Sequence, residues 1–104
     1  MAEVTICRLD ELPDAAPRRF VLDGLAIAVV RIAADVHAVG DVCTHQNVSM
    51  SEGEVDPDTC QIECWKHGSA FDLRTGHPDA LPATRPLPVY PVRVVGDDVI
   101  VTIP

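Results

Sequence analysis

The sequence has no hydrophobic run long enough to cross a membrane. The first residues, MAEVTICRLDELPDAAPRRF, also lack the basic start, apolar run and small-residue cleavage site of a secretion signal. We therefore expect no membrane segment and a cytoplasmic location. Internal repeats, low-complexity tracts and linkers are absent too, so residues 1–104 are expected to form a single domain around one hydrophobic core.

Positive charge is scarce. The sequence has eight lysines and arginines but 16 acidic residues, which gives a formal net charge of −8. The phosphate backbone of nucleic acid would repel such a protein, so we expect no nucleic-acid partner. A protein partner with a basic docking surface is the expectation instead.

The sequence offers little support for helices, because nine prolines are spread along it. The one helical candidate is SMSEGEVD, where Ser49 and Glu52 have capping-box spacing. Gly53 and Asp56 follow too soon for a stable helix, so we interpret this segment as a turn and a strand.

Strand patterns occur at both ends of the chain. Near its start, VTIC is expected to form an apolar first strand. RRFVLDGLAIAVVRI predicts a hairpin around Asp23-Gly24 with VHAVGD as its third strand, and PVRVVGDDVIVTIP predicts another around Gly96-Asp97. The fold class is therefore all-β and antiparallel. Between the hairpins, residues 41–88 contain only short strand candidates, QIECW and SAFDLRTG, and all the unusual chemistry.

That chemistry consists of two Cys-His pairs. Cys43 and His45 lie in CTHQN, and Cys64 and His67 lie in CWKHGSAFD. In a cytosolic chain such cysteines are expected to be ligands or reduced thiols, not disulfides. One interpretation is a structural Cys₂His₂ zinc site, although the single residue between Cys43 and His45 is shorter than the usual zinc spacing. The other is a binuclear iron centre, to which each loop supplies one ligand for each iron.

The motifs C-x-H and C-x-x-H, with Gly68, FDLRTG and LPATRPLPVYPV, resemble those of Rieske-type 2Fe-2S ferredoxins. These are the ferredoxin components of bacterial multicomponent ring-hydroxylating dioxygenase systems. The resemblance covers nearly the whole chain. It implies an antiparallel β-sandwich with a small cluster-binding subdomain, about residues 41–88, inserted between hairpins. The 18 residues 46–63 exceed the family spacer of about 15 to 17, and we place the excess in the turn VDPDT.

The resemblance also implies roles for individual residues. Cys43 and Cys64 would bind one iron of a single 2Fe-2S cluster, and two histidines, His45 and His67, would bind the other. Ser69 would donate a hydrogen bond to a cluster sulfide, unless it is only a turn residue, and Phe71 stands where high-potential members have a tyrosine. Trp65 would shield the cluster or help a partner dock. A proline-rich cover over the cluster would consist of Pro82, Pro86 and Pro88.

Four further cysteine and histidine residues lack ligand spacing. Cys7 and Cys60 are expected to be buried, reduced core residues, with Cys60 on the same face of a strand as Ile62. His37 and His77 are expected to be surface or hydrogen-bonded histidines.

The function implied by the resemblance is that of a one-electron carrier and not of an enzyme, since the chain has no flavin or substrate motif. Its partners would be a flavin-dependent NAD(P)H reductase and a terminal Rieske non-haem iron oxygenase, both docked transiently. An alternative is an accessory or redox-sensing protein linked to iron-sulfur cluster assembly. The small subunit of a nitrite reductase is disfavoured, because that branch often lacks the four ligands present here.

Overall fold

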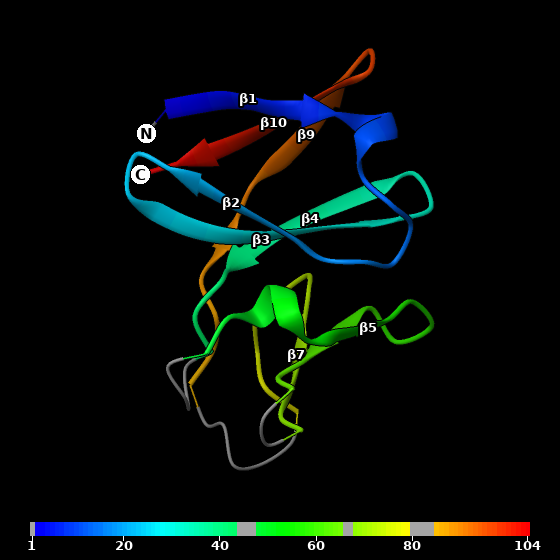
Figure 1. Ribbon diagram of the computed structural model, residues 1–104, viewed down its shortest axis with the longest axis vertical. Coiled ribbons are helices and arrows are strands. Elements are labelled where there is room, and N and C mark those ends of the chain that lie inside the picture. The colour runs from blue at the N-terminus through cyan, green and yellow to red at the C-terminus, as the bar shows by residue number, and fades with distance from the viewer. Residues whose placement is uncertain (1, 44–47, 66–67, 80–84) are drawn as a thin grey trace.

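A computed structural model describes residues 2–43, 48–65, 68–79 and 85–104 (Figure 1). Within these ranges the chain forms strands joined by short turns, and the only helical segments are two 3-10 turns, η1 (Leu9–Glu11) and η2 (Met50–Glu52). The strands are β1 (Ala2–Arg8), β2 (Arg18–Leu22), β3 (Leu25–Ile32), β4 (Asp35–Gly40), β5 (Glu54–Asp56), β6 (Gln61–Glu63), β7 (Ala70–Asp72), β8 (Val89–Tyr90), β9 (Val92–Val95) and β10 (Asp98–Ile103).

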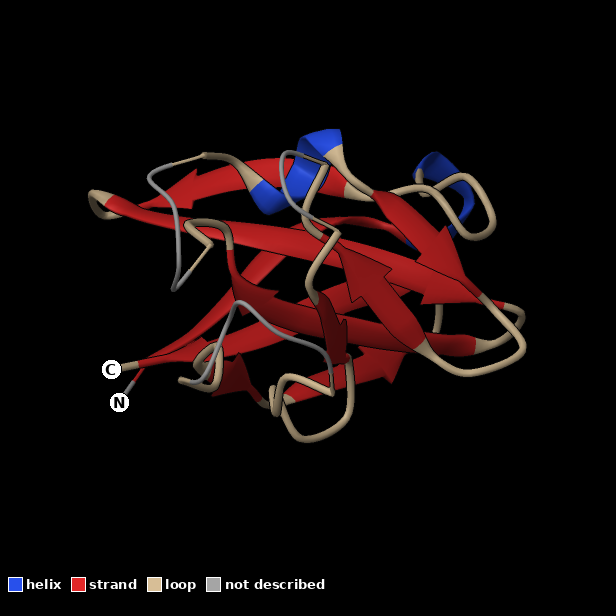
Figure 2. Cartoon of the chain, turned by 90° about the horizontal axis from the view of Figure 1, so that it is seen from below, coloured by secondary structure: helices blue, strands red, loops and turns tan. Residues whose placement is uncertain are grey.

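The described residues form three antiparallel sheets. The first has the strand order β1-β10-β9, the second β2-β3-β4-β8, and the third β5-β6-β7. The sheets follow one another along the long axis, with the third sheet at the end away from β1 and β10 (Figure 1). Seen from below, the strands lie in layers, and the helical turns occupy connections between them (Figure 2). The predicted all-β antiparallel fold is confirmed.

Both predicted hairpins form, and each turns at the predicted residues. Asp23 and Gly24 join β2 to β3 with φ angles of 53° and 81°, so both central residues are left-handed, as a type I′ turn requires. Gly96 and Asp97 join β9 to β10, and Gly96 has a φ of 60°.

Residues 25–30 of strand β3 are all apolar, and residues 27–30 are buried on both faces of the strand. Ile27 and Val29 belong to one core and Ala28 and Val30 to another, as the twofold periodicity of a strand requires. The sandwich core, between the first and second sheets, comprises Leu12, Ile27, Val29, Ala38, Val99, Val101 and Ile103. The cysteine core, between the second and third sheets, comprises Ala28, Val30, Val39, Cys43, Met50, Ile62, Cys64, Phe71, Leu73 and Leu87.

The chain passes from the second sheet to the first at Pro91. Strand β8 pairs with β4, whereas β9, one residue later, pairs with β10. Pro91 has no N–H to donate, but its carbonyl oxygen accepts the backbone N–H of Thr102 at 2.9 Å. A proline therefore stands where the strand changes partner.

The segment SMSEGEVD forms the turn and strand that its sequence predicts, η2 followed by β5. The side chain of Ser49 makes no cap hydrogen bond to η2, so the apparent capping box does not form. At Gly53 a Cβ atom would lie 1.8 Å from the carbonyl oxygen of Glu63, so only glycine allows β5 and β6 to approach here. No helix in the described ranges is long and apolar enough to cross a membrane.

Candidate metal centre

Two hairpin tips of equal length carry the cysteines of the Cys-His pairs. Val42 pairs with Ser49 across the first tip, and Glu63 pairs with Ala70 across the second. Residues 43–48 and residues 64–69 lie between these pairs, so each tip has six residues and begins with a cysteine.

Backbone hydrogen bonds fix each cysteine at the neck of its tip. The N–H of Cys43 donates to the carbonyl oxygen of Val48 at 3.0 Å, and the N–H of Cys64 donates to that of Ser69 at 2.7 Å. Gly68, with a φ of 74°, donates its N–H to the carbonyl oxygen of Cys64 at 3.0 Å and so turns the second tip.

The two thiol side chains are buried in the same place. Cys43 is 3% exposed and Cys64 is 1% exposed, and both belong to the cysteine core. Two tips that are remote in sequence thus place their first residues in one apolar core. Buried thiols from two loops in one core are suited to binding a soft metal centre that must be kept from water.

Three of the predicted site residues cannot be placed. His45, His67 and Pro82 lie outside the described residues. Their assignment therefore remains a prediction from the sequence, in which His45 is the third residue of the first tip and His67 the fourth of the second.

Comparison with protein families decides what kind of centre the tips would hold. Residues 2–91 match the model of the family described as Rieske [2Fe-2S] domain. The chain belongs to this family.

Ferredoxins are among the known proteins that the chain resembles over its whole length. It is 36% identical to the 3-phenylpropionate/cinnamic acid dioxygenase ferredoxin subunit of Escherichia coli (strain K12), over 100% of this chain and 96% of that protein. The structure of the carbazole 1,9a-dioxygenase ferredoxin from Nocardioides aromaticivorans IC177 superposes with a TM-score of 0.93 at 35% identity, covering 97% of each chain. A ferredoxin in complex with the oxygenase of carbazole 1,9a-dioxygenase superposes at 0.88, with 37% identity over 95% of this chain and 91% of that one.

A Rieske domain holds one 2Fe-2S cluster, and the described donors fit it. Two thiols are the ligands that one iron of such a cluster needs, and Cys43 and Cys64 are the buried cysteines at the two tips. The expected second pair of ligands follows them in sequence on the same tips. We therefore retain Cys43, His45, Cys64 and His67 as the proposed ligand set.

Asp41 fastens the first tip of the Rieske domain to the second sheet. Its carboxylate is 2% exposed and accepts three hydrogen bonds, from Ser49 Oγ at 2.6 Å, Arg19 Nε at 3.0 Å and the backbone N–H of Ser51 at 3.0 Å. Asp41 precedes Cys43 by two residues, and Ser49 follows the tip directly. The Asp41 network thus holds both ends of the tip. Sequence reasoning missed Asp41, because an aspartate at the end of a strand is usually only a turn residue.

Next to each cysteine an apolar side chain is exposed. Val42, before Cys43, is 51% exposed, and Trp65, after Cys64, is 52% exposed. A shielding role would require Trp65 to be more deeply buried, so its exposure favours the alternative that it contacts a partner. Ser69 and Phe71 are by contrast buried, and Phe71 packs in the cysteine core.

The described end of the proline-rich segment lies against the same core. Leu87 packs in the cysteine core, and its N–H donates to the carbonyl oxygen of Gly76 at 2.8 Å. The carbonyl oxygen of Pro88 accepts the N–H of Gly40 at 2.9 Å. At Gly76, where φ is 79°, a Cβ atom would lie 2.1 Å from the Leu87 oxygen, so glycine is needed for this close approach. These contacts hold residues 87 and 88 beside the cysteine core, and the cover over the cluster stays a prediction, because Pro82 lies outside the described residues.

The structure corrects the expected position of Cys60. Cys60 is not in a strand beside Ile62, but in the turn between β5 and β6, with a left-handed φ of 58°. Its side chain still packs against the cysteine core, and neither Cys60 nor Cys7 forms a disulfide, but both are half-buried and not fully buried as expected. Residues 57–60 form this turn, which overlaps the segment VDPDT where the extra length of the spacer is expected.

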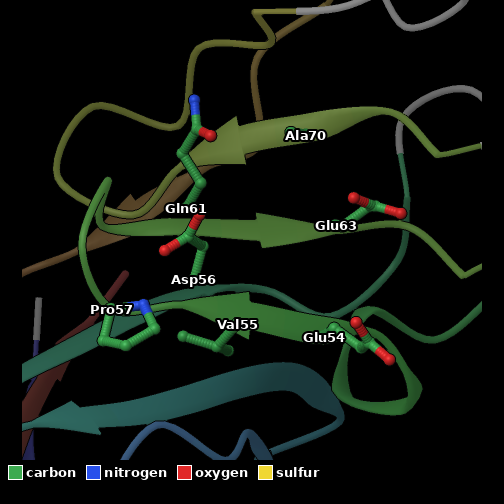
Figure 3. Close-up of a pocket in the computed structure, with 7 residues that line it drawn as sticks. All are labelled: Glu54, Val55, Asp56, Pro57, Gln61, Glu63 and Ala70. Atoms are coloured by element: carbon green, nitrogen blue, oxygen red, sulfur yellow. The ribbon is translucent and has the colours of Figure 1, made fainter.

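An acidic hollow lies on the third sheet (Figure 3). Glu54 and Glu63 are directly opposite one another on β5 and β6, and such like-charged pairs are unfavourable. Val55, Asp56, Pro57, Gln61 and Ala70 complete its lining. The hollow is consistent with the negative charge expected of the whole protein.

Proposed function

We propose that this Rieske protein is a one-electron carrier of a ring-hydroxylating dioxygenase system. It would accept electrons from a flavin-dependent NAD(P)H reductase and pass them to a terminal Rieske non-haem iron oxygenase in the cytoplasm. The 2Fe-2S cluster supplies the one-electron redox couple. The ferredoxins to which the chain is similar over its full length support this assignment.

The observation that carries the proposal is the position of the two tips. Both cysteines are buried, yet Val42 and Trp65 beside them are exposed. The second tip joins β6 to β7 of the third sheet, which lies at the end of the molecule away from the first sheet, and the first tip follows β4 of the second sheet (Figure 1). A centre held just beneath an exposed apolar surface is suited to electron transfer through a short-lived contact, because the electron then has little protein to cross.

Contacts within the protein would keep the surroundings of the centre rigid. The Asp41 network holds the first tip, the Cys64–Ser69 hydrogen bond closes the second, and Leu87 packs in the cysteine core. A rigid environment keeps the ligands in one geometry during oxidation and reduction, so little reorganisation is needed. No proton or substrate has to enter, which agrees with a carrier and not a catalyst.

Reconstitution tests the proposal. The holoprotein is mixed under anaerobic conditions with a flavin-dependent reductase and NADH, and its visible absorption is recorded before and after an oxidised Rieske oxygenase is added. We expect bleaching in the first step and recovery in the second, faster with these partners than with free flavin. A holoprotein that is reduced and reoxidised no faster with any candidate partner, but donates its cluster to apo-proteins, would favour the assembly role instead.

A further inference from the structure

Cys60 and His37 form a second thiol-imidazole pair, separate from the two tips. Cys60 Sγ lies 3.6 Å from Nε2 of His37, although the residues are 23 positions apart in the sequence. Cys60 comes from the turn between β5 and β6, and His37 comes from β4. Both side chains are partly buried where the second and third sheets meet.

The separation of the two atoms suits a shared metal ion. A tetrahedral zinc ion has Zn–S bonds of about 2.3 Å and Zn–N bonds of about 2.0–2.1 Å. With a tetrahedral angle between them, sulfur and nitrogen are then about 3.5 Å apart. The observed 3.6 Å needs almost no movement of either side chain.

The surroundings act differently on the two groups. Burial lowers the pKa of His37, which leaves the imidazole neutral and able to bind a metal at neutral pH, whereas burial raises the pKa of the Cys60 thiol, so a metal would have to displace its proton. Two carboxylates, Asp35 and Asp72, act electrostatically on both groups and are opposed by one guanidinium, that of Arg74. Arg74 is itself paired with Asp72, NH2 to Oδ2 at 3.3 Å.

We propose that Cys60 and His37 bind a thiophilic divalent cation of the Zn²⁺ type, with water completing its coordination. Binding forms one metal–sulfur and one metal–nitrogen bond and releases the thiol proton to solvent, without oxidation or reduction. The site spans the second and third sheets, so an occupied site would link β4 of the second sheet to the turn between β5 and β6 of the third. The inference does not depend on the proposed electron-carrier function.

The chain offers matched controls for a test. The variants Cys60→Ser and His37→Gln each remove one proposed ligand, whereas Cys7→Ser and His77→Gln remove a cysteine and a histidine elsewhere. All are made in the holoprotein, and an unchanged visible spectrum of the cluster shows that each variant is folded. Zn²⁺ is titrated by calorimetry in two buffers of different ionisation enthalpy, which also yields the number of protons released.

We expect one Zn²⁺ per chain with about one proton released, at least tenfold weaker binding in Cys60→Ser and in His37→Gln, and wild-type binding in both controls. Co²⁺ used in place of Zn²⁺ should add a thiolate-to-metal absorption band to the difference spectrum of the wild type that is absent in Cys60→Ser. Equal Zn²⁺ binding by all variants, loss in the controls, or no such Co²⁺ band in the wild type would overturn the proposal.

Discussion

Ser69 is the residue through which the reduction potential can be tested. It is 1% exposed and closes the second tip through its carbonyl oxygen. If its hydroxyl donates to a cluster sulfide, the bond strengthens on reduction because the sulfide becomes more negative. A difference of about 1 kcal/mol between the redox states corresponds to about 40 mV for one electron.

Ser69→Ala should therefore lower the midpoint potential by about 40 mV, as measured by protein-film voltammetry. Ser69→Thr keeps the hydroxyl and should retain most of the wild-type potential. An unchanged potential in Ser69→Ala would show that the serine serves only the turn.

Trp65 should matter for docking and not for the cluster. Its exposed indole follows Cys64 directly, and truncation of a tryptophan at the centre of an interface typically costs about 2 kcal/mol or more. Trp65→Ala should thus weaken the complex with the oxygenase by about thirtyfold or more and leave the potential unchanged.

Stopped-flow kinetics at several oxygenase concentrations separate binding from electron transfer in this variant. Val95→Ala is the matched control, because Val95 is also exposed but lies on β9 of the first sheet, at the other end of the molecule from the third sheet. A Trp65→Ala protein that transfers electrons as fast as Val95→Ala would exclude Trp65 from the docking surface.

At the scale of residues, the sequence predicts those site residues that lie close to one another in the chain. Cys43 and Cys64 could be singled out because each lies close to a histidine in the chain. Asp41 and the pair of Cys60 and His37 could not, because their partners are brought together only by the sheets. Contacts between residues far apart in sequence leave no mark in a local pattern.

At the scale of elements, the Asp41 network should determine how firmly the first tip is held. In Asp41→Asn one carboxylate oxygen is replaced by an NH₂ group, which is itself a donor and cannot accept the hydrogen bond that Ser49 or Ser51 donates. The side chain also loses its negative charge, so the remaining hydrogen bonds at this buried position are weaker. We expect a loss of about 1–3 kcal/mol in the free energy of unfolding.

Thermal unfolding followed by circular dichroism, and the rate at which the cluster absorption bleaches, measure this effect. Asp23→Asn makes the same chemical change in an exposed turn whose left-handed backbone asparagine tolerates, so it should be nearly neutral. Equal stability of the two variants would mean that Asp41 does not hold the tip.

The long strands were predictable and the short ones less so. Asp23-Gly24 specifies the β2–β3 hairpin through its left-handed φ angles, and the periodicity of β10 is clear over its length. Strands β5, β6 and β7 have three residues each, too few for a periodic pattern. The position of Cys60 was wrong for this reason, since the turn before β6 reaches one residue further than the pattern suggested.

At the scale of the whole molecule, charge should govern how fast partners meet. A net charge of −8 attracts basic surfaces, and salt screens this attraction over about 10 Å at 0.1 M ionic strength. The bimolecular rate constant with a reductase or an oxygenase should therefore fall as ionic strength rises from about 0.02 to 0.3 M. Stopped-flow rates that do not change over this range would indicate that docking is mainly apolar.

The arrangement of the sheets could be predicted as a class but not in detail. Alternating strands and the Rieske motifs predict an antiparallel sandwich with an inserted segment. That β3 separates two cores, and that the chain changes sheets at Pro91, depends on packing between remote strands. One of the two cores that β3 separates is the one that contains Cys43 and Cys64.

Electron paramagnetic resonance of the one-electron-reduced protein tests the central claim most directly. We predict two irons and two sulfides per chain, no signal in the oxidised protein, and a signal after reduction with hyperfine coupling to the nitrogens of two imidazoles. His45→Ala and His67→Ala should each lose this centre, whereas Cys7→Ala should keep it. A colourless zinc protein, or a reduced signal without nitrogen coupling, would contradict a Rieske cluster bound by Cys43, His45, Cys64 and His67.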